Sequence, residues 1–254
     1  MFTLGLVSIS FRKNTVEEIL DACRKAGLSS VEWGGDVHVP AGDIQTAERV
    51  KRLTEEAGLA VSAYGSYYKL GDETNTEEKM RALAETARAL GAPMIRIWGG
   101  RESSDRVLKA KRAALVAEAQ ALADIAWEYG IRIAFECHRD TVTDEYHNTV
   151  ELLKEIDREN VGCLWQPLQN RTESYNLDAS KVHAAFSRHI HVFHWDSEGR
   201  YPLAAGHDVW CRYLAPFVGT DTSLMLEFMH DDKLETLCET ADALRAIVRD
   251  VEKR

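Results

Sequence analysis

Cysteine is scarce in this sequence, and its distribution argues against a disulfide framework. The 254 residues contain five cysteines, which is an odd number, and no Cys-x-x-Cys pair occurs. Such a set is typical of reduced thiols in the cytoplasm, where disulfides are rare. Cys137 and Cys163 are flanked by apolar residues, which favours buried core positions over catalytic ones. We therefore expect a cytoplasmic location.

Long hydrophobic runs and a basic leader are also absent. No segment approaches the roughly 18 apolar residues of a membrane span. The first residues, MFTLGLVSIS, lack the basic region and long apolar stretch of a signal peptide, so we expect none. The net charge of −10 leaves no broad basic surface for a phosphate backbone. We expect neither a membrane nor a nucleic acid as a partner.

A glycine recurs at the same position of an approximate repeat in the first half of the chain. Gly27, Gly58, Gly91 and Gly130 each follow a helical pattern and precede an apolar, strand-like run. The position after a helix often needs a positive φ, which glycine adopts without a Cβ clash. The repeat therefore predicts alternating helices and strands.

Two helix starts show the spacing of a capping box. Asn14 precedes TVEEILDACRKA with Glu17 three residues on, and Asn75 precedes TEEKMRALAETARAL with Glu78 three residues on. Another helix is expected to begin after Gly42 or Asp43.

Eight predicted strands alternate with eight predicted helices. The strands are expected near 3–8, 30–34, 59–64, 93–98, 131–136, 161–166, 189–195 and 223–229. The helices are expected near 15–26, 44–57, 76–90, 104–129, 145–158, 178–187, 207–218 and 231–250. Strict alternation implies a parallel sheet with right-handed crossovers. With a length close to the ~250 residues of one barrel, it predicts an α/β fold, a (β/α)8 TIM barrel, as a single domain over residues 1–254. The alternative is an open doubly wound sheet, but no Gly-rich phosphate fingerprint follows the first strand.

The stretch 131–140, IRIAFECHRD, has the composition of a barrel strand with a polar end. Ile131, Ile133 and Phe135 favour an extended, buried conformation. Glu136 and His138 are two residues apart, so a strand would present both on one face. A carboxylate at the end of an apolar run carries a large desolvation cost unless a cation or a proton meets it.

Three later predicted strands also end in polar groups. Their polar residues are Gln166, His194, Asp196 and Glu227. Function in such a barrel gathers at the carboxyl ends of the strands, so we expect one shared site. Two glutamates, a glutamine and a histidine can hold a divalent ion. The expected metal ligands are Glu136, Gln166, His194 and Glu227. Gln166 would bind through its amide oxygen, or it could instead hydrogen-bond a substrate hydroxyl.

The order of these residues resembles the xylose-isomerase-like superfamily of sugar isomerases and epimerases. The motifs that carry the resemblance are AFECH, LWQP, VFHWD and LMLEF, and it covers essentially the whole chain. His191 and His194 compete for the histidine position. Arg200 follows His194 by six residues, which matches an arginine that contacts substrate in ketose epimerases of this group, and this favours His194. The segments HVP at 38–40 and GHDVW at 206–210 fit loop patterns of the same group.

One motif departs from the superfamily. Its sixth strand usually carries Asp-x-x-His, whereas this sequence reads Gln166-Pro-Leu-Gln169. Loss of that carboxylate should weaken metal binding and leave the ion a stronger Lewis acid.

The resemblance implies an isomerase or epimerase that acts on a sugar or sugar phosphate through an enediolate. Its cofactor would be a divalent ion (Mn, Mg, Co or Zn), and Glu136 and Glu227 would be the catalytic acid and base. Substrate contacts are expected from His38, Trp98, His138, Gln169, His191 and Arg200. The alternatives are a catalytically silent sugar-binding barrel and a dehydratase of the same superfamily; a repair nuclease is disfavoured by the acidic charge. Besides the sugar, a second copy of the chain is a candidate partner.

Overall fold

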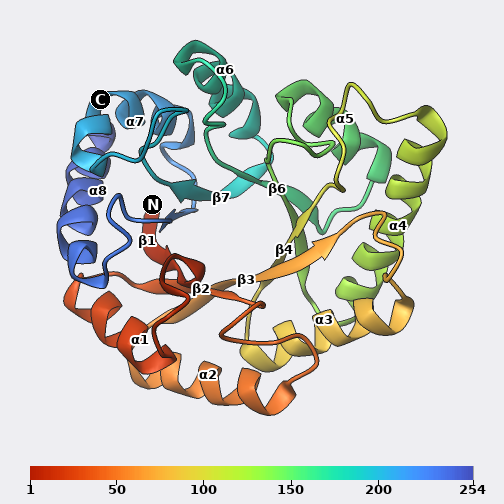
Figure 1. Ribbon diagram of the computed structural model, residues 1–254, viewed down its shortest axis with the longest axis horizontal. Coiled ribbons are helices and arrows are strands. Elements are labelled where there is room, and N and C mark those ends of the chain that lie inside the picture. The colour runs from red at the N-terminus through yellow and green to blue at the C-terminus, as the bar shows by residue number, and fades with distance from the viewer. Residues whose placement is uncertain (254) are drawn as a thin grey trace.

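Eight parallel strands close into a barrel in the computed structural model, which describes residues 1–253 (Figure 1). Each strand pairs with its neighbour in the chain, and the last pairs with the first through Phe2 to Leu6 and Thr222 to Leu226. The strands are β1 (Phe2–Val7), β2 (Ser30–Gly34), β3 (Ala60–Lys69), β4 (Met94–Trp98), β5 (Arg132–Glu136), β6 (Val161–Trp165), β7 (Ser187–Val192) and β8 (Thr222–Leu226). The predicted (β/α)8 TIM barrel is therefore confirmed.

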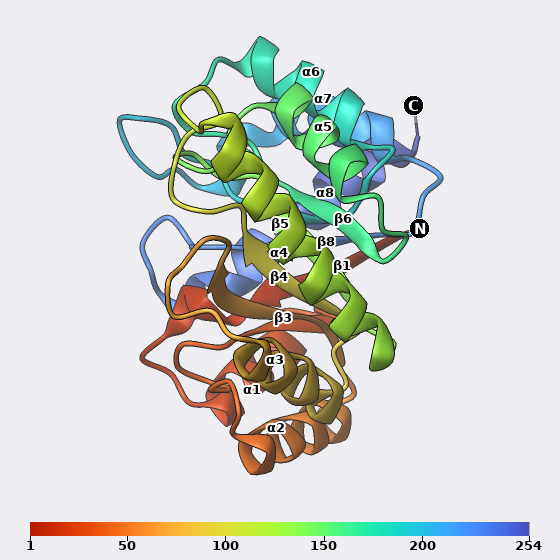
Figure 2. The same ribbon diagram turned by 90° about the vertical axis from the view of Figure 1, so that its right-hand side faces the viewer.

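Eight α-helices surround the barrel (Figure 1). They are α1 (Val16–Lys25), α2 (Ile44–Glu56), α3 (Glu77–Leu90), α4 (Lys109–Glu128), α5 (Tyr146–Ile156), α6 (Glu173–His183), α7 (His207–Leu214) and α8 (Leu237–Glu252). Short 3-10 turns cover Ser8–Phe11, Leu203–Gly206, Ala215–Phe217 and Leu234–Thr236. In Figure 2 the N-terminus lies at one end of the barrel, and the loops that follow the strands extend from the other. None of the helices within residues 1–253 has the length and apolarity that crossing a bilayer requires.

Several predicted boundaries are wrong, and one of them affects the site. The strand expected over 59–64 runs to Lys69, and the helix expected over 231–250 begins only at Leu237. The helix expected over 104–129 begins only at Lys109, and the helix expected over 178–187 spans Glu173–His183. The strand expected over 189–195 ends at Val192, after which residues 195 and 200 form an isolated antiparallel bridge. Residues 193–195 therefore belong to the loop above the barrel.

The predicted helix starts are shifted by one residue, and the capping box is confirmed only at α1, because the third residue after the cap of α3 is Lys79. Thr15, and not Asn14, caps α1: its hydroxyl accepts from the Glu18 amide, and the Glu18 carboxylate accepts from the Thr15 amide. Thr76, in place of Asn75, caps α3. Both threonines have extended backbones, which aim the hydroxyl at the free amides of the first turn. Asp43 caps α2.

The four glycines of the repeat have the predicted backbone conformation. Their φ values are 63° at Gly27, 73° at Gly58, 75° at Gly91 and 71° at Gly130. Each ends a helix by the left-handed turn that L side chains rarely adopt.

Large apolar side chains fill the space between the strands and the helices. Trp165 of β6, for example, lies 5.6 Å from Tyr213 and 6.0 Å from Phe217 between ring centroids.

The interior of the barrel is instead partly polar. Glu32 of β2 contacts Arg96 of β4 and a histidine of β7. Because these strands are not neighbours, their side chains must meet across the barrel.

Gly5 of β1 leaves no room for a side chain between β2 and β8. A Cβ atom there would lie 2.6 Å from the backbone oxygen of Ser30 and 2.5 Å from Cε of Met225. We predict that Gly5→Ala lowers the free energy of unfolding by about 1–3 kcal/mol, because the buried neighbours must shift. Urea denaturation measures the change. Gly199→Ala is the control, since no atom lies within 4 Å of its Cβ position; equal losses in the two variants would contradict the prediction.

Candidate active site at the barrel mouth

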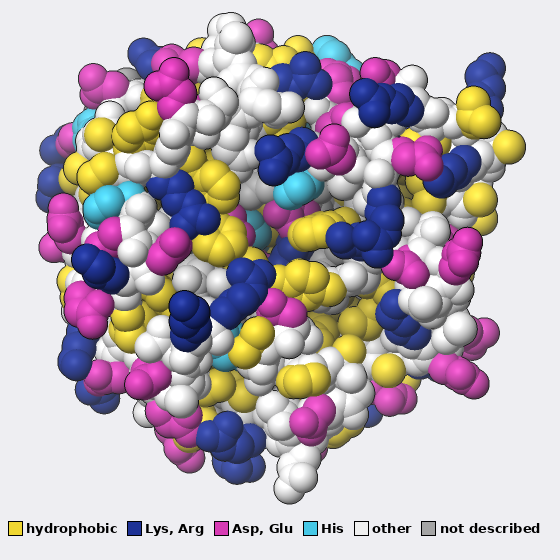
Figure 3. All heavy atoms as spheres, viewed as in Figure 1, with side chains coloured by type: hydrophobic (Ala, Val, Ile, Leu, Met, Phe, Trp, Pro, Cys, Tyr) yellow, Lys and Arg dark blue, Asp and Glu magenta, His cyan; other side chains and the backbone are white. Residues whose placement is uncertain are grey.

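A cavity of about 510 Å³ opens at the carboxyl ends of the strands. The predicted site residues that line it are Trp98, Glu136, His138, Gln166, Gln169 and Glu227. Figure 3 looks onto this face and shows a central hollow with acidic, basic and histidine atoms at its base and hydrophobic atoms on its rim. The structure thus gathers most of the predicted residues in one place.

Glu136 is held by three donors at the end of β5. Its Oε2 accepts from Nη1 of Arg96 at 2.6 Å and from the indole N–H of Trp98, and its Oε1 accepts from Nε2 of Gln166 at 3.0 Å. Burial alone would raise the pKa of Glu136, but the charges of Arg96, His191 and His138 outweigh burial and lower it. Glu136 is therefore an ionised, oriented carboxylate.

Gln166 follows β6 and is 4% exposed. Its amide N–H groups donate to Glu136 and to the carbonyl of Cys137 at 3.1 Å. Its Oε1 has no hydrogen-bond partner among the described residues. A buried amide oxygen without a donor suits a ligand atom for a cation or for a substrate hydroxyl.

Glu227 and His191 form the opposite side of the site. Nδ1 of His191 lies 3.4 Å from Oε2 of Glu227, and His191 is fully buried. The amide of Glu227 donates to Val192, and the amide of Phe228, a residue with φ of 47°, donates to Oγ of Ser10. Burial would lower the pKa of His191, but the carboxylates of Glu227 and Glu32 raise it to about 10.

His191 takes the place that the sequence analysis gave to His194. Because β7 ends at Val192, His194 lies in the following loop. Its ring is 5.6 Å from that of Tyr201 and packs against Gly206. Neither His194 nor His191 lines the cavity, but His191 contacts Glu227, which does. The sequence signal that favours His191 is the spacing of His189 and His191, which alternate with Ile190 and share one face of the strand.

Sequence reasoning also missed a buried charge cluster below the cavity. Glu32 is fully buried, and it accepts from Nε2 of His189 at 2.8 Å, Nε2 of His191 at 2.9 Å and Nε of Arg96 at 3.1 Å. Burial would raise the pKa of Glu32, but His191, His189 and Arg96 hold it well below its usual range. Arg96 is 1% exposed, and it bridges Glu32 and Glu136. Arg101, in contrast, pairs with Asp72 on the surface.

His138 and Trp98 form one wall of the cavity. Their rings stack with centroids 5.1 Å apart and planes at 16°. Nδ1 of His138 donates to the carbonyl of Arg139 at 2.7 Å. In the neutral imidazole this bond places the proton on Nδ1 and leaves Nε2 as a base.

Two other predicted contacts lie away from the cavity lining. His38 is buried, with Nδ1 3.0 Å from the Ser8 hydroxyl. Arg200 is paired with Asp232, and its guanidinium lies 4.9 Å from the ring of Trp195 and 5.0 Å from that of Phe228. Since Trp195 and Phe228 line the cavity, Arg200 supports its rim.

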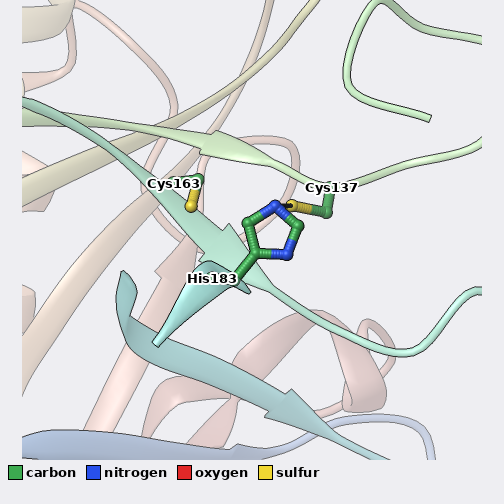
Figure 4. Close-up of side chains that lie close together, drawn as sticks. All are labelled: Cys137, Cys163 and His183. Atoms are coloured by element: carbon green, nitrogen blue, oxygen red, sulfur yellow. Dashed lines mark hydrogen bonds between the residues drawn. The ribbon is translucent and has the colours of Figure 1, made fainter. Parts of the chain in front are cut away.

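A second cluster of metal-type side chains is separate from this cavity (Figure 4). Cys137, Cys163 and His183 have ligand atoms within 4.8 Å of one another, and all three are buried. Sγ of Cys137 lies 3.6 Å from Nε2 of His183, which fits a weak S–H···N hydrogen bond. Burial lowers the pKa of His183 to about 4, so its imidazole is neutral. With only three ligands and no contact with the cavity, we interpret this cluster as core packing.

The mouth residues fit a divalent ion. Two ligand-type atoms, Oε1 of Gln166 and Nδ1 of His191, have no hydrogen-bond partner among residues 1–253. Both belong to side chains that contact one of the two glutamates at the mouth. Nε2 of His191 is bonded to Glu32, and an imidazole held by a carboxylate in this way is typical of histidine ligands.

Comparisons with known proteins agree with this architecture. A curated 3-dehydroshikimate dehydratase of Bacillus anthracis is 24% identical over 164 residues, which are 62% of this chain and 59% of that protein. The crystal structure of the probable 3-DHS dehydratase AsbF, also from Bacillus anthracis, has a TM-score of 0.79 and 19% identity, with 96% of this chain and 99% of that one covered. The 3-keto-D-glucoside 4-epimerase YcjR of E. coli has a TM-score of 0.74 and 16% identity over 98% of this chain and all of that one.

Metal-containing structures occur among the chains with this fold. A xylose isomerase-like TIM barrel protein from Mycobacterium smegmatis was solved with magnesium (TM-score 0.74, 14% identity, 98% and 97% covered), and the IOLI protein with a zinc atom (TM-score 0.70, 15% identity, 98% of each chain covered). At these identities the structures show the fold alone. The family model described as xylose isomerase-like TIM barrel matches residues 20–210, which is more than half of the sequence. The chain therefore belongs to the xylose isomerase-like TIM barrel family.

Proposed function

We propose that the protein is a metal-dependent isomerase or epimerase of a small sugar or sugar phosphate. The observation that carries the proposal is the pair of unpartnered ligand atoms, Oε1 of Gln166 and Nδ1 of His191, beside the carboxylates of Glu136 and Glu227. These four side chains come from the ends of β5 to β8, as expected for a site at a barrel mouth.

The proposed ligands are Glu136, Gln166, His191 and Glu227, with His191 in place of His194. When bound, a divalent ion would polarise a substrate carbonyl and its neighbouring hydroxyl, which acidifies the C–H bond between them.

Charge balance supports a neutral glutamine in this ligand set. Three buried carboxylates, Glu32, Glu136 and Glu227, face one guanidinium, Arg96. If a bound divalent ion displaces the Nδ1 proton of His191, the ion and Arg96 together balance the charge of the three carboxylates. An aspartate at 166 would leave one uncompensated negative charge in a region that excludes water, where such a charge is costly.

The two glutamates transfer the protons, and each has a different role. Glu136 is engaged by three donors, which makes it a weak base and a firm anchor. Glu227 has one close charged neighbour, His191, and lines the cavity. We therefore assign removal of the substrate proton to Glu227, which gives an enediolate and later releases that proton to solvent. Return of a proton on the other side is assigned to Glu136, which must first take one from solvent.

Loss of water is a second candidate outcome of the same first step. His138 lines the cavity with Nε2 free to accept a proton, and it lies two residues after Glu136. The curated relative is a dehydratase. A base on this wall could remove the proton adjacent to a carbonyl while a hydroxyl leaves the neighbouring carbon.

A cytoplasmic location is part of the proposal. Four of the five cysteines are buried and no Cys-x-x-Cys pair occurs, which suits a reducing compartment.

The reaction class can be tested by isotope exchange. We predict that the metal-loaded protein incorporates deuterium from D₂O at the carbon next to the carbonyl of its substrate, because the transferred proton equilibrates with solvent. The assay incubates free and phosphorylated ketoses, and 3-dehydroshikimate, and follows them by NMR and mass spectrometry. Exchange without a mass loss supports isomerisation or epimerisation, and loss of water supports the dehydratase. A ligand that binds without either change would identify a binding protein.

Glu227→Gln tests the metal site. We predict loss of metal at the mouth and loss of exchange activity, with the fold retained, because the side chain lies at a strand end and not in the apolar core. Calorimetric titration with Mn²⁺ and circular dichroism measure both. Glu235→Gln, on a short surface turn, is the control. Metal binding at wild-type stoichiometry and affinity in Glu227→Gln would refute the assignment.

Gln166→Asp tests whether residue 166 is a ligand. We predict at least about tenfold tighter metal binding, since a carboxylate gains several kcal/mol of Coulomb energy over an amide at short range before desolvation. The metal-free variant should melt at a lower temperature, because the new carboxylate replaces a donor to Glu136 and repels it. Gln166→Asn is the uncharged control. Unchanged affinity in Gln166→Asp would exclude residue 166 from the ligand set.

A further inference from the structure

Glu32 lies beneath the candidate site and does not line its cavity. We propose that Glu32 is a positioning residue: it fixes which ring nitrogen of His191 carries a proton, and so leaves Nδ1 open for a metal ion. The inference rests on the proposed function, because it concerns a ligand of the proposed metal site.

The geometry around Glu32 leaves little freedom for the protons. Its Oε2 lies 2.8 Å from Nε2 of His189 and 2.9 Å from Nε2 of His191. Its Oε1 lies 3.1 Å from Nε of Arg96. A carboxylate can only accept hydrogen bonds, so both imidazoles must carry hydrogen on Nε2. The Nδ1 atom of His191, which lies 3.4 Å from Glu227, is then the ring nitrogen that a metal can bind by displacing its proton.

The substitution Glu32→Gln should reverse this arrangement without changing the shape of the side chain. Arg96 can only donate, so the oxygen of the introduced amide must face Arg96, and its NH₂ group must face the two histidines. The ring nitrogen that meets an N–H donor must accept, which moves the hydrogen of a neutral imidazole to Nδ1. A protonated Nδ1 cannot ligate a metal.

The test is Glu32→Gln with two readouts. Calorimetric titration with Mn²⁺ should show affinity about 10- to 100-fold below wild type, the usual effect of losing the partner of a metal-bound histidine. Long-range ¹H–¹⁵N spectra of the histidines with Zn²⁺ should show His191 with hydrogen on Nε2 in the wild type and on Nδ1 in the variant. A role confined to packing would not move the proton.

Two further variants serve as a control and as a second test. Glu118→Gln is the matched control, because Glu118 also accepts several hydrogen bonds, from Tyr68, Gly71 and Asn75, but lies outside the site; it should bind metal as wild type does. In the double variant Glu32→Gln/Arg96→Met the amide is free to turn its oxygen toward the histidines. This double variant should bind metal more tightly than Glu32→Gln alone. If the two substitutions acted independently, the double variant would instead bind metal more weakly.

The outcomes separate this inference from the proposed function. If Glu227→Gln binds metal as wild type does, the proposed site fails, and the role of Glu32 fails with it. If Glu227→Gln loses metal while Glu32→Gln keeps wild-type affinity and hydrogen on Nε2, only the inference about Glu32 is overturned. Should Glu32→Gln fail to fold, the zinc-loaded wild type still decides: hydrogen on Nδ1 of His191 would overturn the proposal.

Discussion

The buried contact between Glu32 and the cations around it is the constraint on which the barrel mouth depends. A carboxylate without solvent exposure is strongly destabilising unless donors satisfy both of its oxygens. Glu32 meets this requirement with two imidazoles and a guanidinium, and the guanidinium continues to Glu136. Strands β2, β4, β5 and β7 are thereby linked through their side chains as well as through the sheet.

This network accounts for the polar interior of a barrel whose outer surface is covered by apolar side chains. Close apolar packing around the barrel, as at Trp165, holds the backbone rigidly. The charged side chains inside the barrel therefore keep their positions, although like charges among them repel one another. The rigid backbone holds the carboxylates of Glu32 and Glu136 ionised beside the guanidinium of Arg96. The apolar packing lies between the strands and the helices, whereas the charged network lies inside the barrel below its mouth.

The same network surrounds the glutamine at position 166. Its amide N–H groups donate to Glu136 and to the carbonyl of Cys137, so this side chain holds the Glu136 carboxylate in place without adding a negative charge beside it. Arg96 bonds to both Glu32 and Glu136, and it lines the cavity together with Glu136, Gln166 and Glu227.

The sequence by itself determined the architecture, because helix caps, glycine turns and strand patterns are local signals, and the strand pattern recurs eight times along the chain. It also indicated Glu136, Gln166 and Glu227 as neighbours, since strand ends meet at one face of any parallel barrel. It could not decide between His191 and His194, because that choice depends on where β7 stops and the loop begins. Nor could it reveal that Glu32 and Arg96 are paired beneath the site. These residues are 64 positions apart on strands that are not neighbours, and only closure of the barrel brings their side chains together.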